Sequence, residues 1–392
     1  MTKSFSIGAV SALVVSAMTA ASAMGAELTV GMITTLSGPG AGLGTDVRDG
    51  FNLAVQDLGG KFGEFDANVI EADDQRKPDV AVQLTERMLE RDGADIVTGT
   101  IWSNLALAMM PAVARAGKIY ISPNAGPSLL AGEQCNRNFF NFAFQNDNAH
   151  EAMGQHVADA EIERVWLMAP NYPAGHDALR GFRRFYDPSG GEVMDEVYTQ
   201  LGQLDYSAEI ATLQSAKPDA VYFFYPGGMG INFLKQWAQA GIGDDIKLYA
   251  SAFSTSQDIL PAVGEAALGV ESAAHWSPDL DAGLNQQFVA AFQEAYGRTP
   301  SLFAAQAYDT ALFIDTAAKA AGSTETEALI AALEQASIEG ARGAITLNSN
   351  HFPIQNFYLR EVVEAPGGGL TNQIKGVVFE GHTDAYASAC SM

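Results

Sequence analysis

Short apolar runs rich in β-branched and aromatic residues alternate along the chain with stretches whose apolar positions recur every three or four residues. The apolar runs are ELTVGMI, ANVIEAD, ADIVTGT and KIYISP, followed by RVWLMAP, EVMDEVY, AVYFFYP and KLYASA. Between the first two runs, Val47, Phe51, Ala54 and Leu58 are spaced as one buried face of a helix. This alternation of strand and helix predicts an α/β fold in which parallel sheets are flanked by helices.

The rhythm of strands and helices breaks at three places, which suggests that the chain passes three times between two lobes. The breaks lie near Gln145 to Asn148, within ESAAHWSPDLDAGLN, and around Asn348 to Pro353. We expect one lobe to contain residues 27–145 and 276–350, and the other to contain residues 149–272 and 353–392. Three crossover strands at one boundary would form a hinge. The length of 392 residues, with 47% apolar residues, also exceeds what a single core usually serves.

The first 23 residues have the pattern of an export signal. They combine a cation at Lys3, an apolar stretch from Phe5 to Ala20, and small residues at Ala21 and Ala23. Cleavage is expected after Ala23 or after Ala26. No later segment is apolar enough to cross a membrane, so we expect an exported protein that does not span the membrane.

The charge and the cysteines restrict the partners and the compartment. With 46 acidic residues against 22 lysines and arginines, the formal charge is −24, which repels nucleic acid and anionic lipid. The two cysteines, Cys135 and Cys390, would both reach an oxidising compartment. We expect a disulfide that pins the C-terminal tail; the alternative is two reduced structural cysteines.

The motifs of catalysis, metal binding and nucleotide binding are missing from the sequence. The glycine-rich turn TTLSGPGAGLG at residues 34–44 follows a strand and precedes a helix, but its glycines do not have the spacing G-x-G-x-x-G. The six histidines form no H-x-x-x-H pair, and G-x-S-x-G is absent. Neither catalytic residues, nor a metal, nor a cofactor are therefore expected.

The residues that follow the predicted strands are the better candidates for a site, because open parallel sheets bind ligands at the carboxyl ends of their strands. These segments are residues 36–45, 100–104 and 123–127 in the first half, and residues 171–175, 225–228 and 251–253 in the second. They contain small, hydroxyl, amide and aromatic residues but no lysine or arginine. Trp102, Tyr172 and Tyr225 are unusual for plain turns, since loop aromatics generally need a partner.

The order of these motifs resembles that of the type I periplasmic solute-binding proteins, in particular the branched-chain amino acid binding subfamily of ABC importers. The matching segments are LSGPGAGLGTDVRDGFNLAVQDLGG, EADDQRKPDVAV, VTGTIWSNLALAMMPAVARAGKIYISPNAGP, SAKPDAVYFFYPGGMGINFLKQWAQAGI and PSLFAAQAYDTALF. The resemblance implies two doubly wound parallel-sheet lobes joined by three crossover hinge strands. It also implies a periplasmic protein that closes around a small solute and docks on a membrane permease. It implies neither catalysis nor a cofactor, and we expect a monomer.

The resemblance also transfers site residues. Ser103 matches the serine that holds a ligand carboxylate together with backbone N–H groups, and Trp102 and Asn104 lie beside it. Asn124, Ala125 and Gly126 match a second segment, in which Gly126 replaces a hydroxyl residue that helps to hold a ligand ammonium. Tyr225 matches a tyrosine that contacts this ammonium. Four further residues are expected to contact the ligand: Leu43, Tyr172, Ser251 and Phe253. Leu43 replaces an aromatic residue of the family, and Ser251 and Phe253 stand where an acidic residue often completes the ammonium site.

These departures favour a carboxylate without an α-ammonium, and the added aromatic residues point to an aromatic acid within this class. A buried ammonium without its acceptors costs several kcal/mol. Amino acid or amide binding with carboxylates from other loops is the alternative ligand, and a sensor for a signalling partner is the alternative role. A hydrolase or reductase lacks motifs, and a transcription repressor would need a DNA-binding headpiece. Leu43 either touches ligand or packs the turn, and hinge packing is favoured over ligand contact for His275 and Trp276.

Overall fold

The first sheet is built from the N-terminal third of the chain in this computed structural model, which describes residues 1–2 and 26–392. Its strand order is β2-β3-β1-β4-β5-β6. The strands are β1 (Glu27–Thr34), β2 (Lys61–Phe62), β3 (Phe65–Asp73), β4 (Ile96–Thr98), β5 (Ile119–Ser122) and β6 (Phe139–Asn141). All pairs are parallel except β2 with β3. The expected export signal falls almost wholly outside the described residues and stays a prediction.

Helices connect these strands as the apolar spacing predicts. They are α1 (Ala41–Asp57), which follows the short 3₁₀ turn η1 (Gly38–Gly40), then α2 (Pro78–Glu90), α3 (Ser103–Ala116) and α4 (Ser128–Ala131). Val47, Phe51 and Ala54 are buried, as expected for one face of α1. Pro78 occupies the first turn of α2, where a missing backbone N–H costs nothing.

The second sheet is mixed rather than parallel throughout. Its order is β12-β13-β14-β11-β10-β9-β7-β8, and β15 pairs with β14. The parallel strands are β7 (Arg164–Pro170), β8 (Glu192–Thr199), β9 (Ala220–Phe223), β10 (Lys247–Ser251) and β11 (Glu271–Ala274). The antiparallel strands are β12 (Ser337–Gly340), β13 (Gly343–Leu347), β14 (Pro353–Glu364) and β15 (Leu370–His382). The parallel part follows the predicted pattern, and the antiparallel part was not predicted.

The remaining helices accompany these strands and the returning chain. They are α5 (Asn148–Asp159), α6 (Pro173–Tyr186), α7 (Ser207–Ala216), α8 (Gly228–Ala240), α9 (Leu260–Val263), α10 (Asn285–Tyr296), α11 (Leu302–Ala321) and α12 (Thr326–Leu333). Four 3₁₀ turns complete the list: η2 (Asp187–Ser189), η3 (Ala252–Ser254), η4 (Gly264–Ala267) and η5 (Ala387–Ala389). Although α11 follows β11 of the second sheet in the chain, it packs against α1 of the first.

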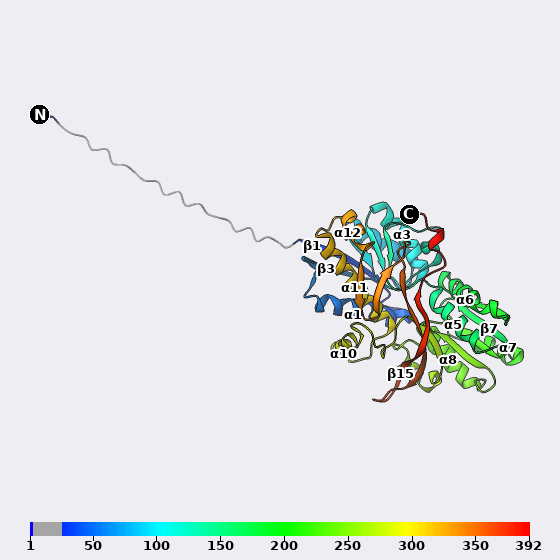
Figure 1. Ribbon diagram of the computed structural model, residues 1–392. Coiled ribbons are helices and arrows are strands. Elements are labelled where there is room, and N and C mark those ends of the chain that lie inside the picture. Colours follow the sequence, from blue (N-terminus) through cyan, green and yellow to red (C-terminus); the bar gives the residue numbers. More distant parts are fainter. Residues whose placement is uncertain (3–25) are drawn as a thin grey trace.

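Figure 1 shows the result as two groups of elements, with α3, α11 and α12 in one and α6, α7 and α8 in the other. The chain passes between them through residues 142–147, through residues 275–284, and again between α12 and β14. The predicted fold class, two α/β lobes with three connections, is confirmed. The residue at which each lobe begins stays a prediction.

A buried arginine ties two of these connections together. Arg342 donates from Nε to Asp309 Oδ2 of α11 at 2.7 Å, and both side chains are fully buried. Its Nη1 donates to the carbonyl of Ala143 at 2.8 Å and to Gln355 Oε1 at 3.0 Å. Breaking a buried pair of this kind typically costs about 3–5 kcal/mol. The first and third connections are therefore fixed to one another at the lobe boundary.

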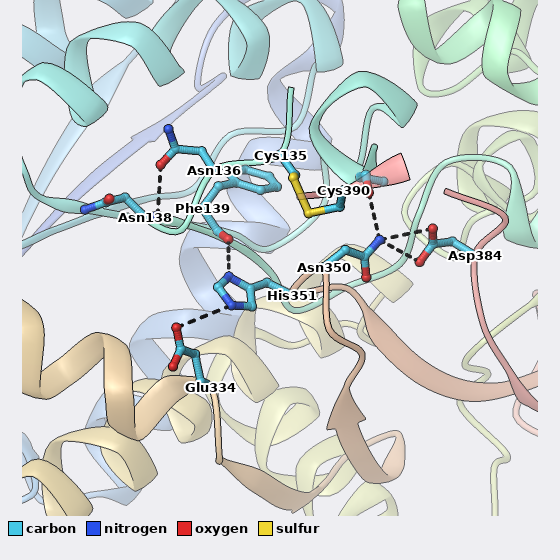
Figure 2. The surroundings of a disulfide bond; sticks show 10 residues. Cys135, Asn136, Asn138, Phe139, Glu334, Asn350, His351, Asp384 and Cys390 are labelled. Carbon is cyan, nitrogen blue, oxygen red and sulfur yellow. Dashed lines mark hydrogen bonds and ion pairs between the residues drawn. A yellow bond between two sulfur atoms is a disulfide. The ribbon is translucent and has the colours of Figure 1, made fainter. Parts of the chain in front are cut away.

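The disulfide between Cys135 and Cys390 is present, as predicted, and Figure 2 shows its surroundings. Close by, Asn350 donates to the carbonyl of Ala131 at 2.9 Å and to Asp384 Oδ2 at 3.0 Å. The C-terminal tail is therefore attached to the loop that follows α4, beside the first sheet.

Candidate ligand-binding site

A cavity lies where the carboxyl ends of the strands in the two sheets face each other. The first lobe and α11 contribute Leu43, Ile101, Trp102, Ser103, Asn124 and Phe303. The first connection contributes Phe144 and Asn146, and the second lobe contributes His150, Tyr172, Ala174, Phe224, Pro226 and Phe253. The space open to the centre of a water-sized sphere is about 20 Å³, little more than one ordered water needs. A small organic solute can therefore enter only when the walls separate.

Aromatic rings from both lobes form most of the wall. The centroid of Trp102 lies 6.2 Å from that of Tyr172, and Tyr172 in turn stacks near Phe224 at 6.2 Å with an angle of 18°. The indole of Trp102 donates to Thr35 Oγ1 at 2.9 Å, and this hydroxyl donates to Asp74 Oδ1 at 2.6 Å. Because its N–H is engaged behind the wall, Trp102 offers the cavity an apolar face.

The polar part of the wall centres on the first turn of α3. Ser103 is buried, and its hydroxyl oxygen accepts from Asn146 Nδ2 at 3.0 Å. Among the hydrogen bonds of residues 26–392, the Ser103 hydroxyl hydrogen has no acceptor, so it is free to donate into the cavity. Asn146 is itself fixed, because its Nδ2 also donates to Asp177 Oδ2 at 2.8 Å and its Oδ1 accepts from Gly126 N at 3.1 Å.

The backbone adds further donors at the same place. Trp102 is the extended N-cap of α3, and the first residues bonded back to its carbonyl are Leu105 and Ala106. The N–H groups of Ser103 and Asn104 donate to no other protein group in the described part of the chain. Free N–H groups and the positive end of the helix dipole make this turn suitable for an anion.

His150, in the first turn of α5, is the nitrogen donor of the opposite wall. It is buried, with its ring centroid 5.0 Å from that of Phe224. Its Nδ1 is hydrogen-bonded to the Tyr222 hydroxyl. Burial in these apolar surroundings lowers the pKa of His150 to about 3, so the imidazole is neutral near pH 7. The lining residues include no lysine, arginine, aspartate or glutamate.

The structure brings six of the eleven predicted contact residues to the cavity: Leu43, Trp102, Ser103, Asn124, Tyr172 and Phe253. Leu43 lines the cavity and also packs near Gly227 of the opposite lobe, where an added Cβ would lie 2.9 Å from Leu43 Cδ1. Its contact with ligand stays a prediction. The side chains of the other five predicted residues do not line the cavity.

Each of these five has a place elsewhere. Tyr225 lies in an aromatic cluster with Tyr206, at a centroid distance of 4.8 Å. Ser251 shares a hydrogen bond of 2.9 Å with Ser254. Ala125 and Gly126 lie behind the wall, and a Cβ on Gly126 would lie 2.1 Å from the carbonyl oxygen of Phe144, which leaves no room for the hydroxyl residue found in the family. Asn104 can contribute its backbone N–H only.

Eight lining residues were not among the predicted contacts: Ile101, Phe144, Asn146, His150, Ala174, Phe224, Pro226 and Phe303. Three of them, Ile101, Ala174 and Pro226, nevertheless lie in the strand-end segments 100–104, 171–175 and 225–228 that were predicted as candidates for the site. A signal existed for some of them, since Phe224 and Pro226 flank the predicted Tyr225. Asn146 and His150 belong to NFAFQNDNAH, where amides and a histidine follow aromatic residues at the first connection. Phe303 lies on a helix that is distant in sequence.

His275 and Trp276 are part of the second connection and do not line the cavity. Trp276 is fully buried and donates from Nε1 to Asn285 Oδ1 at 2.7 Å. His275 Nε2 lies 3.0 Å from Gln306 Nε2 of α11. Both residues therefore pack the hinge, as the favoured interpretation predicted.

Two further features are absent from residues 26–392: a helix able to cross a membrane and a cluster of side chains able to hold a metal ion. No helix formed by these residues has the length and apolar character needed to cross a membrane. Nor do histidine, cysteine, aspartate and glutamate side chains gather anywhere within residues 26–392 as a group of three that could hold a metal ion.

Comparison with known proteins gives one consistent result. A family model described as periplasmic binding protein matches residues 27–368. A Leu/Ile/Val-binding protein homologue of Brucella melitensis is 26% identical over 93% of this chain and 95% of its own. A solute-binding protein of an ABC transporter from R. palustris, solved with benzoate, is 32% identical with a TM-score of 0.88, covering 93% of this chain and all of its own.

A second solved structure points the same way. The solute-binding protein of an ABC transporter from Rhodopseudomonas palustris BisB5, in complex with 3,4-dihydroxybenzoic acid, is 28% identical to this chain. Its TM-score is 0.87, and the match covers 92% of this chain and 99% of the other.

Proposed function

The chain belongs to the periplasmic binding protein family, and on that premise we propose that it captures a small aromatic carboxylate between its lobes for an ABC importer. The observation that carries this proposal is the chemistry of the cavity. Its wall is aromatic, and its polar groups are neutral donors gathered at the first turn of α3.

A carboxylate suits this turn for a physical reason. The Ser103 hydroxyl and the N–H groups of Ser103 and Asn104 are donors without acceptors, and the helix dipole adds a positive potential. Hydrogen bonds to a charged acceptor contribute roughly 1.5–3 kcal/mol each. The flat faces of Trp102, Tyr172 and Phe224 would cover the ring of the acid.

The same wall disfavours an α-amino acid. A buried ammonium needs several acceptors, usually with a carboxylate among them. The lining residues include no acidic side chain, and their unengaged side-chain acceptors within the described part of the chain are Asn124 Oδ1 and the Tyr172 hydroxyl. The position of Tyr225, away from the cavity, removes a further acceptor that the amino acid binders use. Although a curated relative is named for leucine, isoleucine and valine, the cavity chemistry supports the ligand class of the benzoate and dihydroxybenzoate complexes.

The small volume of the cavity supports binding by closure of the two lobes. In the present arrangement the lobes touch across it, because Ser128 of α4 donates from N and Oγ to the carboxylate of Asp177 in α6, at 3.0 and 2.7 Å. An open form must exist for the solute to enter, and the ligand shifts the population toward the closed form. The closed form then docks on the membrane permease.

Family membership supports the remaining parts of the proposal. Proteins of this family bind solutes for ABC transporters and are not enzymes. We infer that this chain is an exported, periplasmic monomer that needs no cofactor and leaves its ligand chemically unchanged. Its large negative charge limits adsorption to nucleic acid and anionic lipid.

A ligand panel tests the proposal directly. Purified protein is heated with benzoate, hydroxybenzoates, aliphatic acids or leucine, and unfolding is followed by fluorescence. A ligand at a hundred times its dissociation constant stabilises the native state by about 2.7 kcal/mol, which raises the melting temperature. We expect aromatic carboxylates to do so and leucine not to.

The outcomes that contradict the proposal are equally clear. A shift with leucine but none with aromatic acids would overturn the ligand class while leaving the family intact. Recovery of a chemically altered acid after incubation would point to an enzyme instead. Titration calorimetry of the responding ligands then gives the affinity and a stoichiometry of one per chain.

A further inference from the structure

His150 lines the cavity, but the proposed function does not yet assign it a role. The carboxylate is held at the first turn of α3 in the first lobe, whereas His150 belongs to α5 of the second lobe. Among the rings that line the cavity, its neighbours are Phe224 at 5.0 Å and Phe253 at 6.4 Å between centroids. His150 therefore stands among the side chains that would cover the aromatic ring of the ligand.

The hydrogen bond to Tyr222 determines which nitrogen of the imidazole carries the proton. Tyr222 is fully buried, which raises the pKa of its hydroxyl, and its O–H has no other acceptor among the hydrogen bonds of the described residues. The hydroxyl must donate to Nδ1, because the opposite direction would leave a buried O–H unpaired. The remaining proton of the neutral ring is then on Nε2.

This Nε2–H group has no partner among residues 26–392, although the residue lines the cavity. Two acceptors that line the same cavity are equally unengaged within the described chain. Asn124 donates from Nδ2 to the carbonyl of Ile101 at 2.8 Å, while its Oδ1 has no partner. The Tyr172 hydroxyl also forms no hydrogen bond with another described residue. A ligand group that accepts one hydrogen bond and donates another would satisfy the donor and one of these acceptors.

We propose that His150 donates from Nε2 to a hydroxyl oxygen on the ring of the ligand, which makes a hydroxylated aromatic carboxylate the preferred ligand. This inference rests on the proposed function and narrows it. A phenolic hydroxyl fits because it accepts from His150 and donates to Asn124 or Tyr172, whereas benzoate leaves all three groups unpaired. Tyr222 acts on the ligand only through the tautomer of His150 and is a positioning residue.

The test compares ligands that differ by one oxygen. The dissociation constants of benzoate, 3-hydroxybenzoate and 4-hydroxybenzoate are measured by calorimetry for the wild type and for His150→Phe, His150→Gln and Tyr222→Phe. In the wild type we expect at least one hydroxybenzoate to bind roughly 2- to 10-fold more tightly than benzoate. His150→Phe should abolish this preference, so that the ratio of the benzoate and hydroxybenzoate dissociation constants falls to about 1 whatever the absolute affinity for benzoate.

The other two variants separate the hydrogen bond from the shape of the wall. Glutamine retains an amide N–H donor near the position of Nε2, so His150→Gln should recover part of the preference. Tyr222→Phe frees Nδ1 to take the proton, so it should lower the preference while benzoate affinity changes little. Circular dichroism and thermal unfolding establish which variants are folded.

The outcomes distinguish this inference from the proposed function. If the wild type binds none of the three acids, the proposed function fails. If it binds benzoate with no preference for either hydroxybenzoate, or if the preference persists unchanged in His150→Phe, the role of His150 is wrong and the proposed function stands. Should His150→Phe not fold, an unchanged preference in both His150→Gln and Tyr222→Phe would overturn the inference, and a reduced preference in Tyr222→Phe would support it.

Discussion

Ser103 is prepared to donate by the residue behind it. Its oxygen already accepts from Asn146, which is itself held by Asp177 and Gly126, so the hydroxyl hydrogen is directed to whatever occupies the cavity. A neutral hydroxyl can thus serve a carboxylate although no lysine or arginine lines the cavity. Such preorganisation reduces the entropy lost when the ligand is bound.

Removing this hydroxyl should weaken binding of an aromatic acid. Ser103→Ala is expected to raise the dissociation constant by an amount that corresponds to roughly 1–3 kcal/mol, because a charged oxygen loses a donor and Asn146 loses an acceptor. Calorimetry with benzoate measures the change. Ser251→Ala is the matched control, since Ser251 is equally buried but lies outside the cavity. Equal affinities for the wild type and Ser103→Ala would remove Ser103 from the site.

At this scale the sequence predicted the right loops but not always the right side chains. Adjacent residues at a strand end point to opposite faces, so a shift of one position decides whether Phe224 or Tyr225 faces the cavity. Because both residues are aromatic, the sequence alone does not show which of them faces the cavity. His150 and Asn146 were missed for a different reason, because they follow the connection between lobes rather than a strand.

At the scale of elements, the close packing of α1 against α11 fixes the first lobe to a helix that lies far along the chain. Gly50 makes this approach possible: a Cβ built there would lie 2.2 Å from the carbonyl oxygen of Ala304. Phe303, the neighbour of Ala304, lines the cavity. The position of one aromatic wall residue therefore depends on the contact at Gly50.

A pair of substitutions in one helix tests this contact. Gly50→Ala is expected to destabilise the protein by at least about 2 kcal/mol, because the backbone of α11 must move away or strain. Gly42→Ala, also in α1, meets its nearest atom at 3.8 Å and should instead be neutral or stabilising by up to about 1 kcal/mol. Urea unfolding measures both. If Gly50→Ala matched Gly42→Ala, the two helices would pack less tightly than described.

The elements themselves were largely readable from the chain. Strands β1, β3, β7 and β9 and helices α1 and α2 carry local signals, since apolar period, proline and glycine act within a few residues. The antiparallel pairing of β14 depends instead on less local information. Its partner β11 lies 80 or more residues away, and the position of the β14–β15 pair in the sheet depends on tertiary packing. The sequence therefore indicated a break around Asn348 to Pro353 but not the place in the sheet of the strands on either side of it.

For the whole molecule, the contact between Asp177 and Ser128 links the state of the lobes to the state of the site. Asp177 is buried and accepts from Ser128 of the first lobe on one side and from Asn146 on the other. Asn146 in turn contacts Ser103. Closure and preparation of the Ser103 hydroxyl are therefore parts of one hydrogen-bonded chain.

Disrupting this chain should favour the open form. Asp177→Ala is expected to weaken benzoate binding by roughly 1.5–3 kcal/mol, mainly through faster dissociation, and to raise the radius of gyration with ligand present. Stopped-flow fluorescence and X-ray scattering measure the two effects. Asp187→Ala is the control at the end of the same helix, where the carboxylate forms an exposed pair with Arg183. An unchanged dissociation rate for Asp177→Ala would mean that closure does not use this contact.

The two cysteines are synthesised at different times, and this interval determines when the disulfide can form. Cys390 follows Cys135 by 255 residues, so at ~5–20 residues per second roughly 13–50 s separate the synthesis of the two thiols. Cys135 therefore has no intramolecular disulfide partner while strands β6 to β15 are synthesised. The disulfide can form only after Cys390 has been made, so it cannot guide any folding step that precedes that moment.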